Sequence, residues 1–179
     1  MRHESKKLDA PTASRAVARG LFRAEGNPIR PPWSWNEDDF VAACTRCDKC
    51  TRACSSKIIV RGSDGFPEID FTRGSCTFCG DCVSACEPRA LVRAHQGSTP
   101  WLIKAKITQD CLARNQVACF GCGESCERGA IRFLSRDGGT AVPEIDRKLC
   151  KGCGACLSGC SASAIKVGAF RQATRSRPA

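Results

Sequence analysis

Apolar residues along this chain come in short runs, separated by stretches rich in glycine, cysteine and charged residues. Two segments, residues 58–70 and 130–146, each have two apolar runs around a turn that contains glycine and aspartate. Both segments end in the tetrapeptide Pro-Glu-Ile-Asp. This pattern predicts two β-hairpins of the same kind. A third apolar run, residues 101–107, predicts a single strand.

Helices are predicted mainly before the first hairpin. Residues 12–24 carry apolar side chains at every fourth position, which favours a short helix that precedes the body. Asn36 is followed by three acidic residues, which predicts a capped helix that leads into Cys44. Between the two, residues 30–35 read Arg-Pro-Pro-Trp-Ser-Trp, and the prolines exclude a helix interior. Its two tryptophans either cover a metal site or anchor a partner.

The cysteines follow one repeated spacing. Three motifs read C-x2-C-x2-C-x3-C, and in the third of the four motifs seven residues replace the first two-residue spacer. In chain order the motifs contain Cys44, Cys47, Cys50 and Cys54; Cys76, Cys79, Cys82 and Cys86; Cys111, Cys119, Cys122 and Cys126; Cys150, Cys153, Cys156 and Cys160. The first cysteines are 32, 35 and 39 residues apart, so the chain is an internal repeat.

This spacing is typical of the loops that hold [4Fe-4S] clusters in bacterial ferredoxins. Three thiolates wrap one cluster, and the fourth is expected to open a short helix and bind the neighbouring cluster. Disulfides fit less well, because residues 1–30 contain no apolar signal segment that would export the chain. Zinc fits less well, because zinc sites usually use two separated C-x2-C pairs.

The position of the hairpins predicts how the motifs pair. Hairpins with the shared tetrapeptide lie between motifs one and two and between motifs three and four, which indicates a duplicated two-motif domain rather than pairing of outer with outer motifs. The predicted ligand sets are Cys44, Cys47, Cys50 and Cys86; Cys76, Cys79, Cys82 and Cys54; Cys111, Cys119, Cys122 and Cys160; Cys150, Cys153, Cys156 and Cys126. Because the third motif is irregular at Cys111, four clusters are expected and three are possible.

The predicted fold class is α+β, with two tandem bacterial-type 2[4Fe-4S] ferredoxin domains after a short N-terminal helical extension. The expected boundaries are 1–35 for the basic extension, 36–97 and 98–168 for the two domains, and 169–179 for a basic tail.

The formal charge of +10 is concentrated at the two ends. Four anionic clusters would offset most of it, and the basic ends are either solvated tails or surfaces for an acidic partner. We find no motif that reads nucleic-acid bases, no membrane-spanning run, and no arrangement of nucleophile, base and oxyanion donors. The sequence therefore predicts an electron-transfer or accessory protein rather than an enzyme.

The order of Arg-Pro-Pro-Trp at 30–33, the first cysteine motif, Gly-Phe-Pro-Glu-Ile-Asp-Phe at 65–71 and the second motif resembles the ferredoxin-type NapF proteins. These belong to the periplasmic nitrate reductase system of bacteria. The resemblance implies a soluble, cytoplasmic accessory protein that contacts the molybdenum-containing catalytic subunit before its export and supports its maturation. The alternative is a general electron-transfer ferredoxin or the redox subunit of another oxidoreductase complex.

Overall fold

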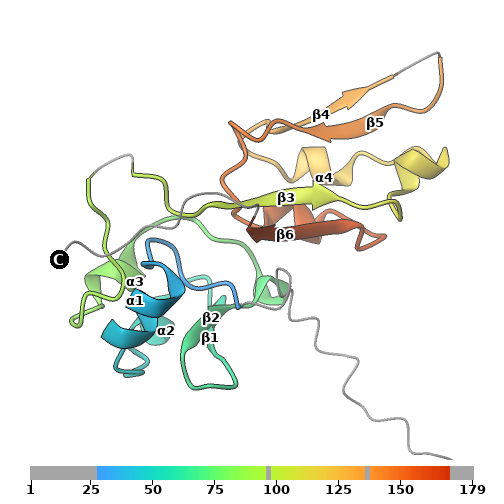
Figure 1. The fold of residues 1–179 in the computed structure, drawn as a ribbon. Helices are drawn as coiled ribbons and strands as arrows, with labels where there is room; N and C mark the ends of the chain where they lie inside the picture. The colour runs from blue at the N-terminus through green and yellow to red at the C-terminus, as the bar shows by residue number, and fades with distance from the viewer. Residues whose placement is uncertain (1–27, 96–97, 136–137, 170–179) are drawn as a thin grey trace, which may run out of the picture.

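The computed structural model describes residues 28–95, 98–135 and 138–169, which combine short helices with two-stranded sheets (Figure 1). The helices are α1 (Glu37–Ala43), α2 (Lys49–Ala53), α3 (Asp81–Ser84), α4 (Gly121–Glu124) and α5 (Ala155–Ser158), with 3-10 helices η1 (Phe71–Arg73) and η2 (Leu112–Asn115). The strands are β1 (Ile59–Arg61), β2 (Pro67–Ile69), β3 (Ile103–Ile107), β4 (Ile131–Leu134), β5 (Val142–Ile145) and β6 (Ile165–Ala169). The helix predicted at 12–24 and most of both basic ends lie outside the described residues.

Both predicted hairpins are present. β1 pairs with β2 and β4 pairs with β5, each in antiparallel register. In the first hairpin Ile59 lies opposite Ile69, and in the second Ile131 lies opposite Ile145. The repeated Pro-Glu-Ile-Asp segment therefore occupies the same strand of both hairpins, as the duplicated pattern predicts.

The strand predicted at 101–107 is β3, and it pairs with the last strand of the described chain. β3 and β6 are antiparallel, with Ile107 opposite Ile165. The first half has a shorter equivalent, an antiparallel bridge between Ser34 and Leu91. In each half, a segment near the beginning thus pairs antiparallel with a segment near the end, and the hairpin lies between these two segments in the sequence.

Helix α1 begins where the sequence predicts. The side-chain oxygen of Asn36 accepts a hydrogen bond from the Asp39 amide at 2.9 Å, which caps the helix. Phe40 is fully buried, and its ring lies 6.3 Å from that of Phe66 in the first hairpin. The helix is therefore fixed to the hairpin just before it delivers Cys44.

The segment before α1 belongs to the body of the protein. The Ile69 amide donates to the Ile29 carbonyl at 2.7 Å, and the Trp33 amide donates to the Pro100 carbonyl at 2.8 Å. Trp33 is only 2 % exposed. Of the two alternatives for this tryptophan, a surface anchor for a partner is therefore wrong, since its ring is used inside the protein.

Candidate functional site

The cysteine loops share an unusual backbone. In the three regular motifs the residues on either side of the second cysteine both have positive φ angles. They are Arg46 and Asp48 (57° and 59°), Phe78 and Gly80 (58° and 92°), and Gly152 and Gly154 (73° and 86°). Left-handed residues reverse the chain direction sharply, so three successive cysteines can face one centre. Three of the six are not glycine, and for that reason no sequence signal revealed this conformation.

Each of the four α-helices from α2 to α5 begins one residue before the third cysteine of its motif and ends before the fourth. The third cysteine lies inside the helix, as with Cys82 in α3, and the fourth follows its end. The expectation that the fourth cysteine opens a helix is therefore wrong. In its place, a tight turn follows each fourth cysteine, in which the amide three residues later donates to the cysteine carbonyl. The donors are Lys57, Arg89, Gly129 and Ser163, at 2.8–3.1 Å, and all four have positive φ.

Two of the predicted cysteine sets line small pockets in the protein. One pocket is lined by Cys54, Cys76, Cys79 and Cys82. Trp33 and Phe78 complete its wall, with their rings edge to face at 6.4 Å. This arrangement agrees with the alternative that Trp33 covers a metal site.

The second pocket is lined by Cys111, Cys119, Cys122 and Cys160. The irregular Cys111 is thus brought to the same place as its predicted partners, and it is buried. The seven-residue spacer forms η2 and then a left-handed turn at Gln116. The Asn115 side chain donates to the Cys111 carbonyl at 2.9 Å, which holds the longer loop closed.

The remaining two sets are brought together as well. Burial raises the pKa of Cys50 to about 11, with further contributions from the neighbouring thiolates of Cys86 and Cys44. Cys47 is among the thiolates that raise the pKa of Cys44, where burial is again the main cause.

The same holds in the second half. The pKa of Cys156 is raised to about 12 by burial first and then by its neighbours Cys153, Cys150 and Cys126. Each of the four sets therefore contains three cysteines of one motif and the fourth cysteine of the other motif in the same half.

Burial disfavours the thiolate form of several of these cysteines when no cluster is bound. Burial raises the pKa of Cys76 and of Cys82 to about 12. Backbone amides act in the opposite direction, since the Phe78 amide donates to the sulfur of Cys76 at 3.4 Å. Such amides favour the thiolate and tune the metal that it binds. Cys47 differs, because it is exposed and the Lys49 amide lowers the pKa of its thiol.

The four sets of cysteines suit [4Fe-4S] clusters better than single metal ions. Among the described residues, no group of three or more His, Cys, Asp or Glu side chains could hold a single metal ion. A cubane distributes four thiolates over four iron atoms, so its ligands stand further apart than those of one zinc ion. Sixteen cysteines in four sets of four therefore fit [4Fe-4S] clusters.

Arg30 is a residue whose role the sequence did not reveal. Its guanidinium donates to the Glu37 carboxylate at 3.0 Å and to the Pro67 carbonyl at 3.2 Å. It also lies over the rings of Phe40 and Phe66, at 5.2 and 5.4 Å. The Arg-Pro-Pro-Trp segment and the Phe-Pro-Glu hairpin, far apart in the sequence, thus form one cluster beside α1.

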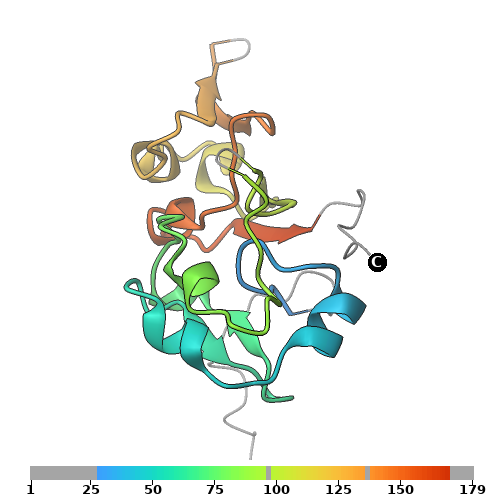
Figure 2. The same cartoon turned by 90° about the vertical axis from the view of Figure 1, so that its left-hand side faces the viewer.

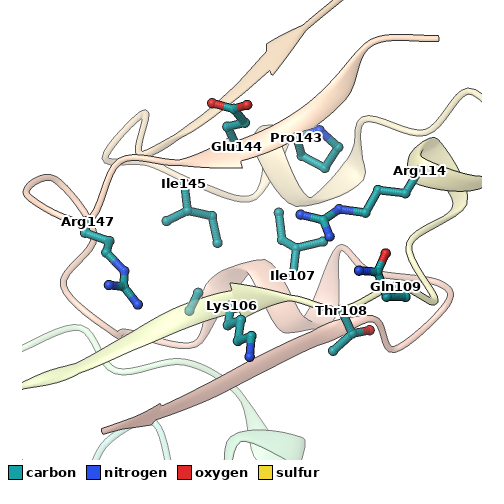
Figure 3. A pocket seen from close by; sticks show the side chains of 10 residues that line it. Lys106, Ile107, Thr108, Gln109, Arg114, Pro143, Glu144, Ile145 and Arg147 are labelled. Carbon is teal, nitrogen blue, oxygen red and sulfur yellow. The ribbon is translucent and has the colours of Figure 1, made fainter. Parts of the chain in front are cut away.

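A separate open groove of about 750 Å³ lies between β3 and β5 (Figure 3). Arg114 extends into it from η2, and Ile107 and Ile145 face each other across it. No cysteine lines this groove, but it shares Ile107 and Pro143 with the neighbouring pocket of Cys111. Within the three described stretches, no helix has the length and apolar character needed to cross a membrane.

Comparisons with known proteins agree with this chemistry. Residues 43–91, which include the first two cysteine motifs, match the family model of a 4Fe-4S dicluster domain. The ferredoxin-type protein NapF of Escherichia coli (strain K12) is 40 % identical over 159 residues, covering 89 % of this chain and 94 % of that protein. The NapF protein of Haemophilus influenzae is 44 % identical over 144 residues, covering 80 % of this chain and 81 % of that protein.

A shorter similarity, 46 % identity over 46 residues, links the chain to the ferredoxin-type protein NapG of Escherichia coli. It covers 24 % of this chain and 20 % of that protein, so it concerns only a part of either one. The two NapF relatives, in contrast, align over most of their length. The chain therefore carries a 4Fe-4S dicluster domain and belongs to the family of ferredoxin-type NapF proteins.

Proposed function

We propose that the chain is a polyferredoxin with four [4Fe-4S] clusters, held by the four cysteine sets described above. The proposal includes two tandem 2[4Fe-4S] domains, 36–97 and 98–168, with residues 29–35 packed against the first. The observation that carries it is the convergence of each motif's first three cysteines with the fourth cysteine of its neighbour. When bound, such clusters supply one-electron transfer without substrate chemistry, so the protein acts as a carrier or accessory rather than an enzyme.

The proposed physiological role is maturation of the catalytic subunit of periplasmic nitrate reductase in the cytoplasm, before that subunit is exported. Membership of the NapF family supports this role, because the family belongs to the nitrate reductase system. The strongly basic ends support contact with an acidic protein surface, since opposite charge speeds encounter between partners. A general electron-transfer ferredoxin is the alternative, and the clusters alone would serve either role.

Metal analysis tests the cofactor part of the proposal. Anaerobically purified protein should contain about 16 iron and 16 sulfide per chain, because each of four sites takes four of each. Replacing Cys111 by alanine should remove about four iron and four sulfide per chain. Replacing one cysteine of any other set by alanine should remove the same amounts. Zinc in place of iron, or iron that does not change in any cysteine variant, would contradict the ligand sets.

Capture of the unexported catalytic subunit tests the role. We expect the holo protein to retain this precursor, and the cluster-free protein to retain little of it. A strain without the protein should make the subunit in normal amount but with low nitrate reductase activity. Trp33 variants are unsuitable for this test, because Trp33 is buried. If the deletion strain keeps full activity and no precursor is captured, the electron-carrier alternative is the better one.

A further inference from the structure

The two halves of the described chain meet through the loops that carry the second and fourth cysteine motifs. The Cys76 amide donates to the Cys153 carbonyl at 2.8 Å, which joins the two loops directly. Beside this bond, the ring of Phe71 packs against Gly154. A β-carbon placed on Gly154 would lie only 2.3 Å from the Phe71 ring, so no side chain fits between the loops.

An aromatic contact closes the same junction. Trp101, which precedes β3 in the second half, lies edge to face with Phe71 at 5.9 Å and with Phe78 at 5.5 Å. Its indole N–H donates to the Arg30 carbonyl at 3.0 Å, and the residue is buried. Because a tryptophan of one half is locked against two phenylalanines of the other, the halves are held together by a packed interface, which we call the inner junction.

The other two motifs lie away from this interface. Helix α2 contacts α3 in the first half, and α4 contacts α5 in the second. Figure 2 shows the helices in the order α2, α3, α5 and α4 along the long direction of the molecule. The α4–α5 approach is close, since a β-carbon on Gly121 would lie 2.4 Å from the Gly159 carbonyl oxygen. The set with three cysteines of the first motif and the set with three cysteines of the third motif therefore lie at opposite ends of the molecule.

We infer that the inner junction makes the sites of the second and fourth motifs immediate neighbours, so that two pairs of sites join into one continuous line of four. This inference rests on the proposed ligand sets and extends them across the halves. The Cys76–Cys153 hydrogen bond and the Phe71–Gly154 contact are the positioning groups, because they fix the separation of the two inner sites. The line has two ends, so a one-electron donor protein and a one-electron acceptor protein can bind at different faces.

Two matched variants test the order of the sites. The first variant carries Cys47→Ala and Cys119→Ala, which remove one ligand from each outer site. Because only its inner sites stay intact, we call it the inner-pair variant. The second variant carries Cys79→Ala and Cys153→Ala, which remove one ligand from each inner site but keep the backbone of the junction. Because only its outer sites stay intact, we call it the outer-pair variant. After anaerobic reduction with dithionite, the EPR spectrum of the inner-pair variant should be broadened and split by spin coupling. The spectrum of the outer-pair variant should be the sum of two isolated signals.

Metal content separates the two levels of inference. Each variant should hold about half of the iron and sulfide of the unaltered protein, which checks the ligand sets independently of coupling. Correct iron content with an uncoupled inner-pair spectrum would overturn the line of four and leave the ligand sets intact. Should a variant fail to load, hydrogen exchange on the unaltered holo protein gives the answer. The Cys76 amide should exchange slowly, and rapid exchange would overturn the junction.

Discussion

Trp33 protects one candidate site from solvent. Its ring is buried, meets Phe78 edge to face and lines the pocket of Cys54, Cys76, Cys79 and Cys82. Replacing it by alanine should cost about 3–5 kcal/mol of stability and admit water to that site. We expect Trp33→Ala to lose about one quarter of its iron on exposure to air before the remainder, as measured by iron content over time.

Trp33→Phe is the control for this prediction, because it keeps a smaller aromatic cover and removes the indole N–H. That N–H makes a long hydrogen bond of 3.4 Å to the Ser98 carbonyl, so its loss should change little. If Trp33→Ala releases all its iron in a single phase, the tryptophan has no specific relation to one site.

Arg30 should not tolerate lysine. Its guanidinium donates to two different acceptors while it lies over two phenylalanine rings, and a lysine ammonium cannot reproduce that planar fork. Arg30→Lys should lower the free energy of unfolding by about 2 kcal/mol, as expected for lost hydrogen bonds to charged groups. The measurement is the denaturant midpoint of the holo protein under anaerobic conditions.

Arg61 offers a matched control for Arg30. It pairs with Asp48, but its side chain is 55 % exposed, so the ion pair is screened by water. Arg61→Lys should change stability much less than Arg30→Lys does. Equal effects of the two substitutions would show that the buried position of Arg30 adds nothing.

At the scale of elements, helix α1 depends on its cap. The Asn36 side chain accepts from the Asp39 amide, and the helix leads directly to Cys44. Asn36→Ala should destabilise the protein by about 1 kcal/mol, and Asn36→Ser should restore most of the loss, because serine is also a good cap. The test is chemical unfolding monitored by the visible absorption of the clusters. A serine variant as unstable as the alanine variant would mean that Asn36 acts through another contact.

The hairpins and the cysteine loops were the most predictable elements. Apolar runs around glycine-containing turns indicate hairpins locally, and the spacing of the cysteines restricts which residues can face one centre. The partner of β3 was not predictable in the same way. Ile107 pairs with Ile165 across almost sixty residues, and the five-residue strand β6 has no local signal that names its partner.

Some of the site also lay beyond sequence reasoning. Arg46 and Asp48 adopt left-handed conformations that are usual for glycine, and only the cluster-loop geometry requires them. Trp33 offered two interpretations, because a tryptophan in a Pro-Pro segment is apolar enough for either a core or a surface anchor. The Trp33 amide donates a hydrogen bond to the carbonyl of Pro100, at the start of the second half, and this long-range contact has no signal in the local sequence.

At the scale of the whole molecule, cluster loading should depend on pH. Burial raises the pKa of Cys76, Cys82 and Cys156 to about 12, so these thiols are protonated at neutral pH in the cluster-free fold. Binding iron requires thiolates and releases those protons. Loading should therefore increase from pH 7 to pH 9, and acid should promote loss of clusters. The measurement is visible absorption after a fixed reconstitution time.

The same groups act on the cluster-free fold with the opposite sign. A thiol whose folded pKa lies above its ordinary value of 9.0 stabilises the fold below pH 9, and this contribution is lost as pH rises towards 12. Alkylation provides a control, because exposed Cys47 has a lowered pKa. At pH 7.5 iodoacetamide should modify Cys47 before Cys82. Equal rates at the two cysteines would contradict the protection of the buried thiols.

The turn after each fourth cysteine also bears on how the four copies of the motif correspond. The donor residues are lysine, arginine, glycine and serine, yet their φ angles are 54°, 58°, 58° and 50°. The side chains differ at all four positions, while the backbone conformation is the same. The turn is therefore a common part of the repeated unit that the side chains alone do not reveal. Backbone angles can therefore align the four copies even where no residue outside the cysteines matches.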